Sequence, residues 1–324
     1  MKRTKRTVYY YDVVVGCRAT HAQPPDLAEL AELWRDFYQS QEAVLLREHG
    51  NIIYRVGDVE IDNNERVARL LIRKSDINAP DAAYSNVETG EIRFAPKREN
   101  EGGDTAAHLL ISLTQEQGSP HVYLCMLEAM TGISHRHVQP LLNTLIRYAC
   151  GQDSQRFTYP DPAGGRHRDG REKRHSFKPK IELRGHTSDD LARDIERGRV
   201  NNLELVADRA QAQFGGDQYL REDTYSLSVK VDRNLPTQNR LGRLIQAMCS
   251  RREHFGTGRI RFRDENEKMH TVAYDLQTGA PEQQMYIKSF VIDNINPPMA
   301  LSSDSIVRHF SDEVERRLKR DRNI

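Results

Sequence analysis

The stretch Ala106-Ala-His-Leu-Leu-Ile-Ser-Leu113, followed by Val122-Tyr-Leu-Cys-Met-Leu127, decides the fold class. Both runs are apolar and have the length of a strand, and a loop at 115–120 connects them. Hairpin signals, in which two strand-like runs flank a turn, occur at 52–73, 86–94 and 258–274. Helical patterns lie between the strands without the regular alternation of a βαβ protein. The sequence therefore predicts an α+β fold with mainly antiparallel sheets and packed helices.

Apolar residues at helical spacing predict the helices. The first follows the capping residue Asp26 and runs through Arg47. A second lies within 134–148, where Pro140 either starts or kinks it. The last helix bears an apolar stripe over 306–318 and ends in a basic tail. This stripe could pack on its own sheet or against a second chain, and we expect a homodimer or a partner protein.

A change in composition predicts the division of the chain into two domains or subdomains. The 324 residues are about twice the ~150 residues of an average domain. After Gly151 the segment 152–180 contains almost no apolar residue, and proline and glycine recur in it. We therefore expect an N-terminal α+β domain at 1–151, a basic linker or loop at 152–180, and a C-terminal α+β domain with the terminal helix at 181–324.

Composition excludes the membrane, collagen-like and disulfide-rich classes. No stretch approaches the ~18 apolar residues of a membrane span. The basic N-terminus precedes an apolar run that Asp12 interrupts, so we expect no secretory signal. The four cysteines lie far apart and form no CxxC pair, which favours a reducing cytoplasm over a disulfide framework or a zinc site. They are Cys17, Cys125, Cys150 and Cys249.

Clustered positive charge is the sharpest functional signal. The net charge is only +1, so the signal is local. The segment 164–180 carries seven Lys or Arg against Asp169 and Glu172, and Phe177 within it could stack on a base. A flexible cationic segment suits a phosphate backbone, although long loops are often charged for solubility alone. The candidate nucleic-acid-binding residues are Arg166, Arg168, Arg171, Lys173, Arg174, Lys178 and Lys180, with Arg259, Arg261 and Arg263 as a second cationic stripe on the outer face of a strand.

A metal-dependent nuclease is the enzymatic alternative. Such an enzyme holds its cations with clustered carboxylates. Asp58, Glu60 and Asp62 alternate along one strand and would share a face, although they also fit the polar side of a half-exposed strand. The sequence contains no GxxxxGK[ST], GxGxxG, GxSxG or HExxH motif, so we expect no cofactor and no bound metal, and we favour a non-catalytic protein. A protein-interaction scaffold whose basic patches only maintain solubility is the third possibility.

The order of elements resembles that of the RexA-type phage-exclusion proteins and related abortive-infection proteins. The shared features are a helix at 191–198, the run Asn202-Leu-Glu-Leu-Val206, the hairpin at 261–275 and a basic C-terminal helix. In the first half, the run 107–113 precedes a helix that ends near Tyr148. The resemblance implies a non-catalytic, DNA-binding, dimeric sensor or effector subunit of bacterial or prophage anti-phage defence, and it carries over no active-site residue. On that basis the expected partners are DNA rather than RNA, and a second copy or a protein from the same operon.

Overall fold

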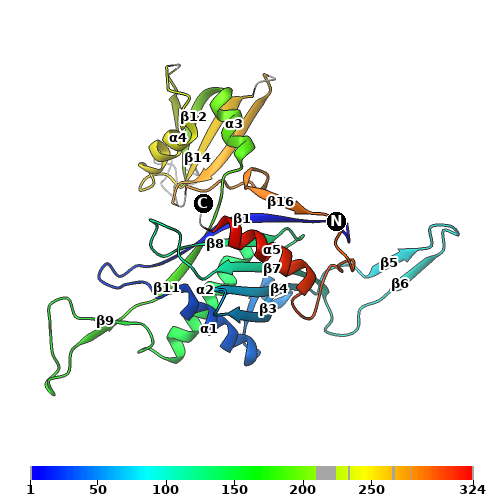
Figure 1. Ribbon diagram of the computed structural model, residues 1–324, viewed down its shortest axis with the longest axis horizontal. Helices are drawn as coiled ribbons and strands as arrows, with labels where there is room; N and C mark the ends of the chain where they lie inside the picture. The colour runs from blue at the N-terminus through cyan, green and yellow to red at the C-terminus, as the bar shows by residue number, and fades with distance from the viewer. Residues whose placement is uncertain (1, 209–223, 233, 265–266, 278, 323–324) are drawn as a thin grey trace, which may run out of the picture. The chain divides into compact units, whose positions relative to one another are not determined.

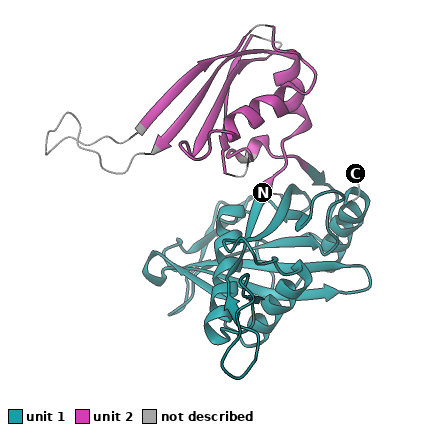
Figure 2. Cartoon of the chain, turned by 90° about the vertical axis from the view of Figure 1, so that its left-hand side faces the viewer, with its two compact units in different colours: residues 1–183, 290–324 teal, residues 184–289 magenta. Residues whose placement is uncertain are grey.

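A computed structural model gives the structure of the protein and describes residues 2–208, 224–232, 234–264, 267–277 and 279–322. The chain forms two compact units (Figure 2). Unit 1 comprises 1–183 and 290–324, and unit 2 comprises 184–289. Both units pack helices on mostly antiparallel sheets, so the fold is α+β, as the sequence predicts. None of the helices within the described ranges has the length and apolar content that crossing a membrane requires.

Unit 1 is built on an eight-stranded sheet in the order β11-β1-β8-β7-β4-β3-β2, with β16 paired to β1 (Figure 1). Its strands are β1 (Arg6–Cys17), β2 (Val44–Arg47), β3 (Ile52–Asp62), β4 (Val67–Asp76), β7 (Gly103–Ser112), β8 (Val122–Glu128), β11 (Pro179–Gly185) and β16 (Ser289–Ile292). The two apolar runs that decide the fold class form β7 and β8 and pair antiparallel. They lie at the centre of the sheet, where nearly every side chain is buried.

Three helices cover this sheet, namely α1 (Leu27–Gln39), α2 (His135–Gln152) and α5 (Arg308–Asp321). Tyr11 of β1 and Tyr123 of β8 face α2 and α1, since their hydroxyls lie within 3.3 Å of His135 Nδ1 and of the Leu27 backbone N–H. Alternate residues of the same strands face α5 instead. Both faces of the central strands are therefore shielded, which explains their continuous apolar sequences.

The first helix is shorter than the sequence predicts, because it ends at Gln39 and not at Arg47. Gln41 has a φ of 62°, in the left-handed region that a right-handed helix excludes. The apolar residues beyond it form the strand β2, which pairs with β3. A 3-10 turn, η1 (Glu48–Gly50), then leads into β3.

The C-terminal segment 290–324 belongs to unit 1, which differs from the expected domain at 181–324. Phe310, Val314 and Leu318 of α5 are buried among strand residues that include Val8 and Met126. The stripe that suggested a second chain thus packs on the sheet of its own unit. The sequence reveals an apolar stripe of this kind but not the sheet that it covers. The division between the units also falls at 183, beyond the expected boundary segment.

A buried ionic network ties both ends of unit 1 to the sheet. Glu128 Oε1 accepts a hydrogen bond from Arg6 Nε at 2.9 Å, and its Oε2 accepts from His108 Nδ1 at 2.7 Å. His108 Nε2 accepts from the backbone N–H of Val307 at 3.0 Å, which leaves Nδ1 as the donor to Glu128. Arg6 also donates to the carbonyl of Ala300 at 2.9 Å. The side chains of Arg6 and Glu128 are each 1% exposed, and that of His108 is 3% exposed.

Unit 2 is a four-stranded antiparallel sheet in the order β13-β12-β14-β15, with two helices on one face. Its elements are α3 (Asp189–Arg197), β12 (Arg199–Asp208), β13 (Thr224–Lys230), α4 (Arg240–Cys249), β14 (Thr257–Arg263), β15 (Met269–Asp275) and the 3-10 turn η3 (Gln284–Tyr286). Two successive helix–strand–strand segments contribute β12 and β14 to the centre of the sheet. Leu203, Leu205, Ile260 and Phe262 lie on the face that the helices cover.

Two hairpins leave the sheet of unit 1 and are largely exposed. One consists of β5 (Ala82–Ser85) and β6 (Ile92–Ala95), and the other of β9 (Thr158–Pro160) and β10 (Arg174–Ser176). In Figure 1 both extend away from the helices of this unit. The segment 152–180, expected as a linker or long loop, contains the β9–β10 hairpin and the residues around it.

Replacing Glu128 by Ala should lower the free energy of unfolding of unit 1 by about 3–5 kcal/mol, because it leaves the Arg6 guanidinium buried without its carboxylate. Glu128→Gln, which keeps hydrogen-bonding atoms, should cost less. The single tryptophan, Trp34, is fully buried in α1, so its fluorescence reports on unit 1 during urea denaturation. Glu99→Ala, at an exposed turn of unit 1, is the control. A loss below about 1 kcal/mol in Glu128→Ala would contradict this role of the network.

Acid should destabilise unit 1 through His135. Burial, followed by the charges of Arg136 and His137, lowers the pKa of His135 to about 4 from 6.5. As the pH falls from 6.5 to 4, the unfolded chain binds a proton that the folded chain does not, so the free energy of unfolding should fall by up to about 3 kcal/mol. Urea denaturation followed by Trp34 fluorescence across this pH window measures the slope. His135→Gln should flatten it, and an unchanged slope in that variant would contradict the assignment.

Candidate nucleic-acid interface

The basic segment forms a projecting hairpin. Strands β9 and β10 pair antiparallel, with Tyr159 opposite His175. The connecting loop is closed further out by a bridge between Arg166 and Glu172. All seven predicted basic residues of this segment are exposed. The chain therefore presents these side chains to solvent on a short strand pair with a long loop.

Three of the seven basic side chains have acidic neighbours. Arg171 pairs with Asp169 at 2.6 Å, Arg174 with Glu172 at 3.4 Å, and Lys180 with Glu182 at 2.5 Å. Ion pairs between exposed side chains are worth only about 0–1 kcal/mol, so they do not prevent exchange for a phosphate. The remaining four form no ion pair with any residue that the structure describes, and they are Arg166, Arg168, Lys173 and Lys178.

Aromatic side chains meet where the hairpin joins the body of unit 1. The ring centroid of Phe177 lies 6.0 Å from that of Phe157 and 6.1 Å from that of Tyr159. Tyr159 in turn lies 5.6 Å from His175. Phe157 is buried, whereas Tyr159 and Phe177 are half-buried. Partly exposed rings beside unpaired cations are the combination that single-stranded nucleic-acid platforms use.

The second predicted line lies in unit 2, on β14. Arg259, Arg261 and Arg263 lie on the sheet face opposite the helices, each a little under half exposed. The outer-face alternation that the sequence predicts is therefore confirmed. Glu204 of β12 pairs with Arg261 at 2.9 Å and with Arg259 at 3.5 Å, and Glu267 pairs with Arg263 at 3.3 Å. These carboxylates offset part of the positive charge of the stripe, and each of its three arginines has an acidic partner.

Asp58 and Glu60, two of the three carboxylates considered for a nuclease, fasten the C-terminal segment. Asp58 Oδ2 accepts a hydrogen bond from the backbone N–H of Ile306 at 2.9 Å. Glu60 pairs with Arg308, the first residue of α5, at 2.7 Å and with Arg69 at 3.4 Å. Glu60 thus contacts the start of α5, and Asp58 contacts the residue Ile306 that precedes the helix.

The third carboxylate, Asp62, closes the turn between β3 and β4. It accepts backbone N–H bonds from Asn64 and Glu65, each at 3.0 Å, and these bonds lower the pKa of the carboxyl. Within the ranges that the structure describes, no three His, Cys, Asp or Glu side chains come together as metal ligands would. Each of the three carboxylates makes a structural contact of its own.

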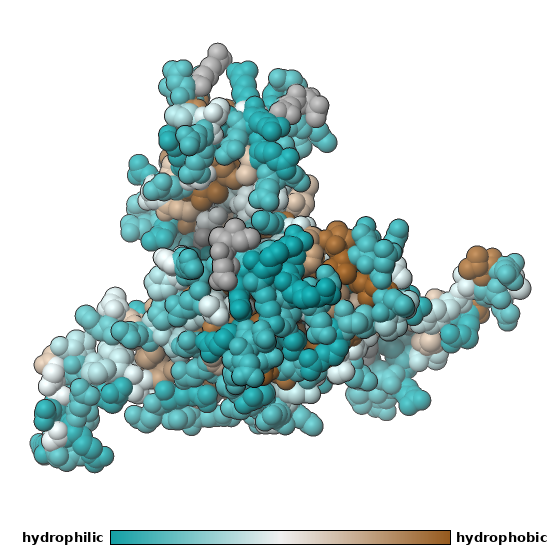
Figure 3. Space-filling view, viewed as in Figure 1, coloured by the Kyte–Doolittle hydropathy of each residue, from teal (hydrophilic) through white to brown (hydrophobic). Residues whose placement is uncertain are grey.

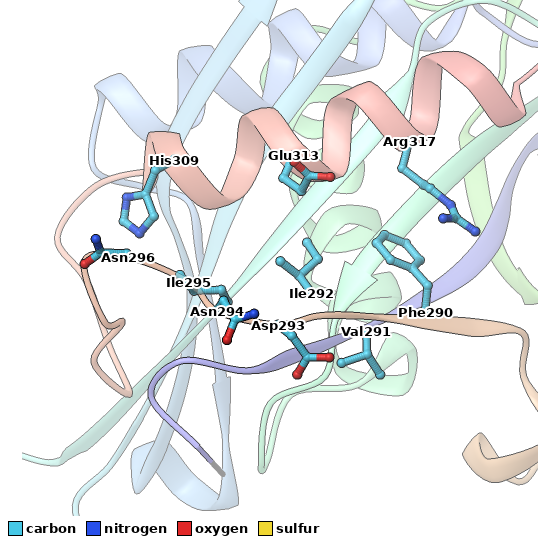
Figure 4. Close-up of a pocket in the computed structure, with 10 residues that line it drawn as sticks. All are labelled: Phe290, Val291, Ile292, Asp293, Asn294, Ile295, Asn296, His309, Glu313 and Arg317. Atoms are coloured by element: carbon cyan, nitrogen blue, oxygen red, sulfur yellow. The ribbon is translucent and has the colours of Figure 1, made fainter.

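A groove of about 480 Å³ lies between the segment that contains β16 and α5 (Figure 4). One wall is the segment 290–296, and the other carries His309, Glu313 and Arg317. Arg317 Nε donates to the Tyr10 hydroxyl at 3.0 Å, and its guanidinium lies 4.9 Å from the Phe290 ring. These contacts hold α5 against the sheet, and the groove shows no converging set of reactive groups among its lining residues.

Two basic residues near the hairpin lie outside the predicted set. Arg18 follows β1 and Arg147 lies on α2, yet they line one cavity together with Lys178 and Lys180. No local pattern could have joined them, because the three segments are far apart in the sequence and meet only through the sheet order.

The chain matched no protein-family model, no curated protein and no solved structure. The structural evidence for a function therefore comes from the arrangement of the chain's own residues.

Proposed function

We propose that the protein binds nucleic acid without catalysis and that the β9–β10 hairpin is its main point of attachment. The observation that carries this proposal is a hairpin with four exposed cations that have no ion-pair partner in the described chain. The half-buried rings of Tyr159 and Phe177 lie at the root of the same hairpin. The cations would bind phosphates and release counterions, and the rings would stack on unpaired bases. The arginines of β14 would add a second, weaker line of phosphate binding.

A role as a sensor or effector subunit of bacterial or prophage anti-phage defence is part of the same proposal. It rests on the resemblance of the element order in the sequence to that of RexA-type proteins, which also implies DNA in preference to RNA. A nuclease is less well supported, because Asp58, Glu60 and Asp62 have other partners. A scaffold would give the hairpin no role in binding nucleic acid. The four cysteines, all without disulfides, suit a cytoplasmic location.

We also propose a homodimer, formed through the β5–β6 hairpin. Four large side chains on it are 55%, 97%, 58% and 68% exposed, namely Tyr84, Val87, Ile92 and Phe94. Figure 3 shows hydrophobic side chains at this tip. A lone two-stranded hairpin is marginally stable in water, and exposed apolar clusters mark interfaces. Ile92 and Phe94 share one face of the hairpin, whereas Arg93 lies over the Tyr84 ring on the other face.

Replacing Arg166 and Arg168 by Glu should weaken binding to both single-stranded and duplex DNA by about tenfold or more at low salt, since two attractions to phosphate become repulsive. The log–log slope of affinity against salt should also become shallower, by about 0.7–0.9 for each phosphate that the variant no longer neutralises. Fluorescence anisotropy with labelled DNA at several salt concentrations measures both quantities.

The matched control is Arg193→Glu with Arg316→Glu, two exposed arginines outside the hairpin that give the same net charge. This control should bind DNA within about twofold of the wild type, because salt screens the interaction between DNA and charges that lie far from the binding site. If the hairpin variant binds both DNAs as well as the control does, the hairpin serves only solubility and the proposal is wrong.

The wild-type chain should have the mass of a dimer by light scattering at micromolar concentration. Ile92→Ser with Phe94→Ser should give a monomer, because these neighbouring side chains share one face of the hairpin. Leu301→Ser, at another exposed apolar residue, should leave the dimer intact. A monomeric wild type, or a dimer that persists in the hairpin variant, would contradict the assignment of this surface.

A further inference from the structure

A cavity of about 560 Å³ opens at the base of the β9–β10 hairpin, entirely within unit 1. Its lining comes from the end of β1, from α2, and from the segment 176–180 that joins β10 to β11. The volume falls in the ~300–1,000 Å³ range of small-molecule sites. The hairpin that projects into solvent thus has a concave site at its root.

Four cations surround this cavity, and no acidic residue is among those that line it. Arg18, Arg147 and Lys178 form no ion pair within the described chain, and Arg147 donates only to Thr144 Oγ1 of its own helix, at 2.7 Å. Lys180 pairs with Glu182, which stands outside the cavity. Three positive charges without local compensation repel one another, and an anion bound between them would relieve that repulsion.

The wall that carries Arg147 is held in place by backbone contacts. Asn143 of α2 donates from Nδ2 to the carbonyl of Ile181 and accepts at Oδ1 from the Ile181 N–H, both at 2.8 Å. Gln139, one turn earlier, accepts from the Leu183 N–H at 2.7 Å. Asn143 and Arg147 are four residues apart and lie on one face of the helix. Helix α2 is thus fastened to β11, and a preorganised site of this kind spends little free energy on ordering itself.

Phe177 supplies the apolar wall and separates this cavity from a second one of about 400 Å³. The second cavity is lined by Phe157 and Tyr159, whose rings contact Phe177 and fix its orientation. A ring that lines two cavities and is packed against two other rings can accept a planar base on its free surface. The first of these cavities also carries the cations that would hold the attached phosphate.

We propose that this cavity binds one nucleoside phosphate unit, with the phosphate held by Arg18, Arg147 and Lys178 and the base stacked on Phe177. A base that is paired and stacked in a duplex cannot enter, so the site takes an unpaired nucleotide from a single strand or a free nucleotide. The proposal deepens the proposed function and rests on it: the hairpin collects nucleic acid through its phosphates, and the cavity selects a strand that can release a base.

The test uses the full chain, with adenosine monophosphate and inorganic phosphate in calorimetry and with labelled single-stranded and duplex DNA in anisotropy. The variant Arg18→Gln with Arg147→Gln should bind the single strand about tenfold or more weakly, with duplex binding within about twofold. Phe177→Leu, which keeps an apolar wall, should abolish the single-strand preference while folding normally. Arg98→Gln with Arg316→Gln, elsewhere on the surface, is the matched control.

The outcomes separate the two proposals. One outcome overturns the cavity proposal and leaves the proposed function standing. In that outcome the Arg166 and Arg168 variant loses nucleic-acid binding, while both cavity variants bind as the wild type does. If adenosine monophosphate binds the wild type and not the cavity variants, the cavity proposal is supported, and a free nucleotide can be the ligand. If the cavity residues are needed for single-strand binding but adenosine monophosphate does not bind, the cavity proposal is supported, and the ligand is a nucleotide within a single strand. Inorganic phosphate that binds as tightly as adenosine monophosphate overturns the stacking role of Phe177.

Discussion

The carboxylate of Glu128, almost completely removed from water, is the constraint on which unit 1 depends. A buried charge costs several kcal/mol unless it is paired and hydrogen-bonded, so only a register that brings Arg6 and His108 to Glu128 is low in energy. That condition aligns β1, β8 and β7. The same residues also bind the C-terminal segment to the sheet, because Arg6 donates to the carbonyl of Ala300 and His108 accepts from the backbone N–H of Val307. Asp58 and Glu60 complete the attachment from β3.

The rigid sheet supports two exposed hairpins of opposite character. The β5–β6 hairpin is apolar at its tip, and the β9–β10 hairpin is basic with aromatic rings at its root (Figure 3). The basic hairpin is continuous with β11, which α2 holds through Asn143. Cations on a projecting loop give affinity without sequence information. The cavity at the root adds what a loop alone lacks, namely an aromatic ring packed against two others and four cations that line one concave site.

The strands and the partners within each hairpin could be predicted from sequence, as the pairs β3–β4 and β14–β15 confirm, whereas the pairing of strands far apart in the sequence could not. The apolar runs at β7 and β8 identify central strands, and the alternation of Arg259, Arg261 and Arg263 predicts their outer face, because both depend on local periodicity. Local periodicity does not reveal that Gln41 breaks a helical pattern, nor that Phe310 packs on the first sheet. The cavity depends on Arg18 and Arg147 being joined by strand order, so it could not be found before the fold. The roles of Asp58 and Glu60 were hidden for the same reason.

The most direct test of nucleic-acid binding at the hairpin and its root is photochemical cross-linking of the full chain to a single-stranded oligonucleotide that carries photoreactive bases, followed by peptide mass spectrometry. Short-range cross-links form only where a base touches a side chain, so they locate stacking independently of charge. The structure predicts cross-linked peptides within 156–180, with Phe177 or Tyr159 as the modified residue. Cross-links confined to other segments, or none at concentrations where the strand is bound, would contradict that interface.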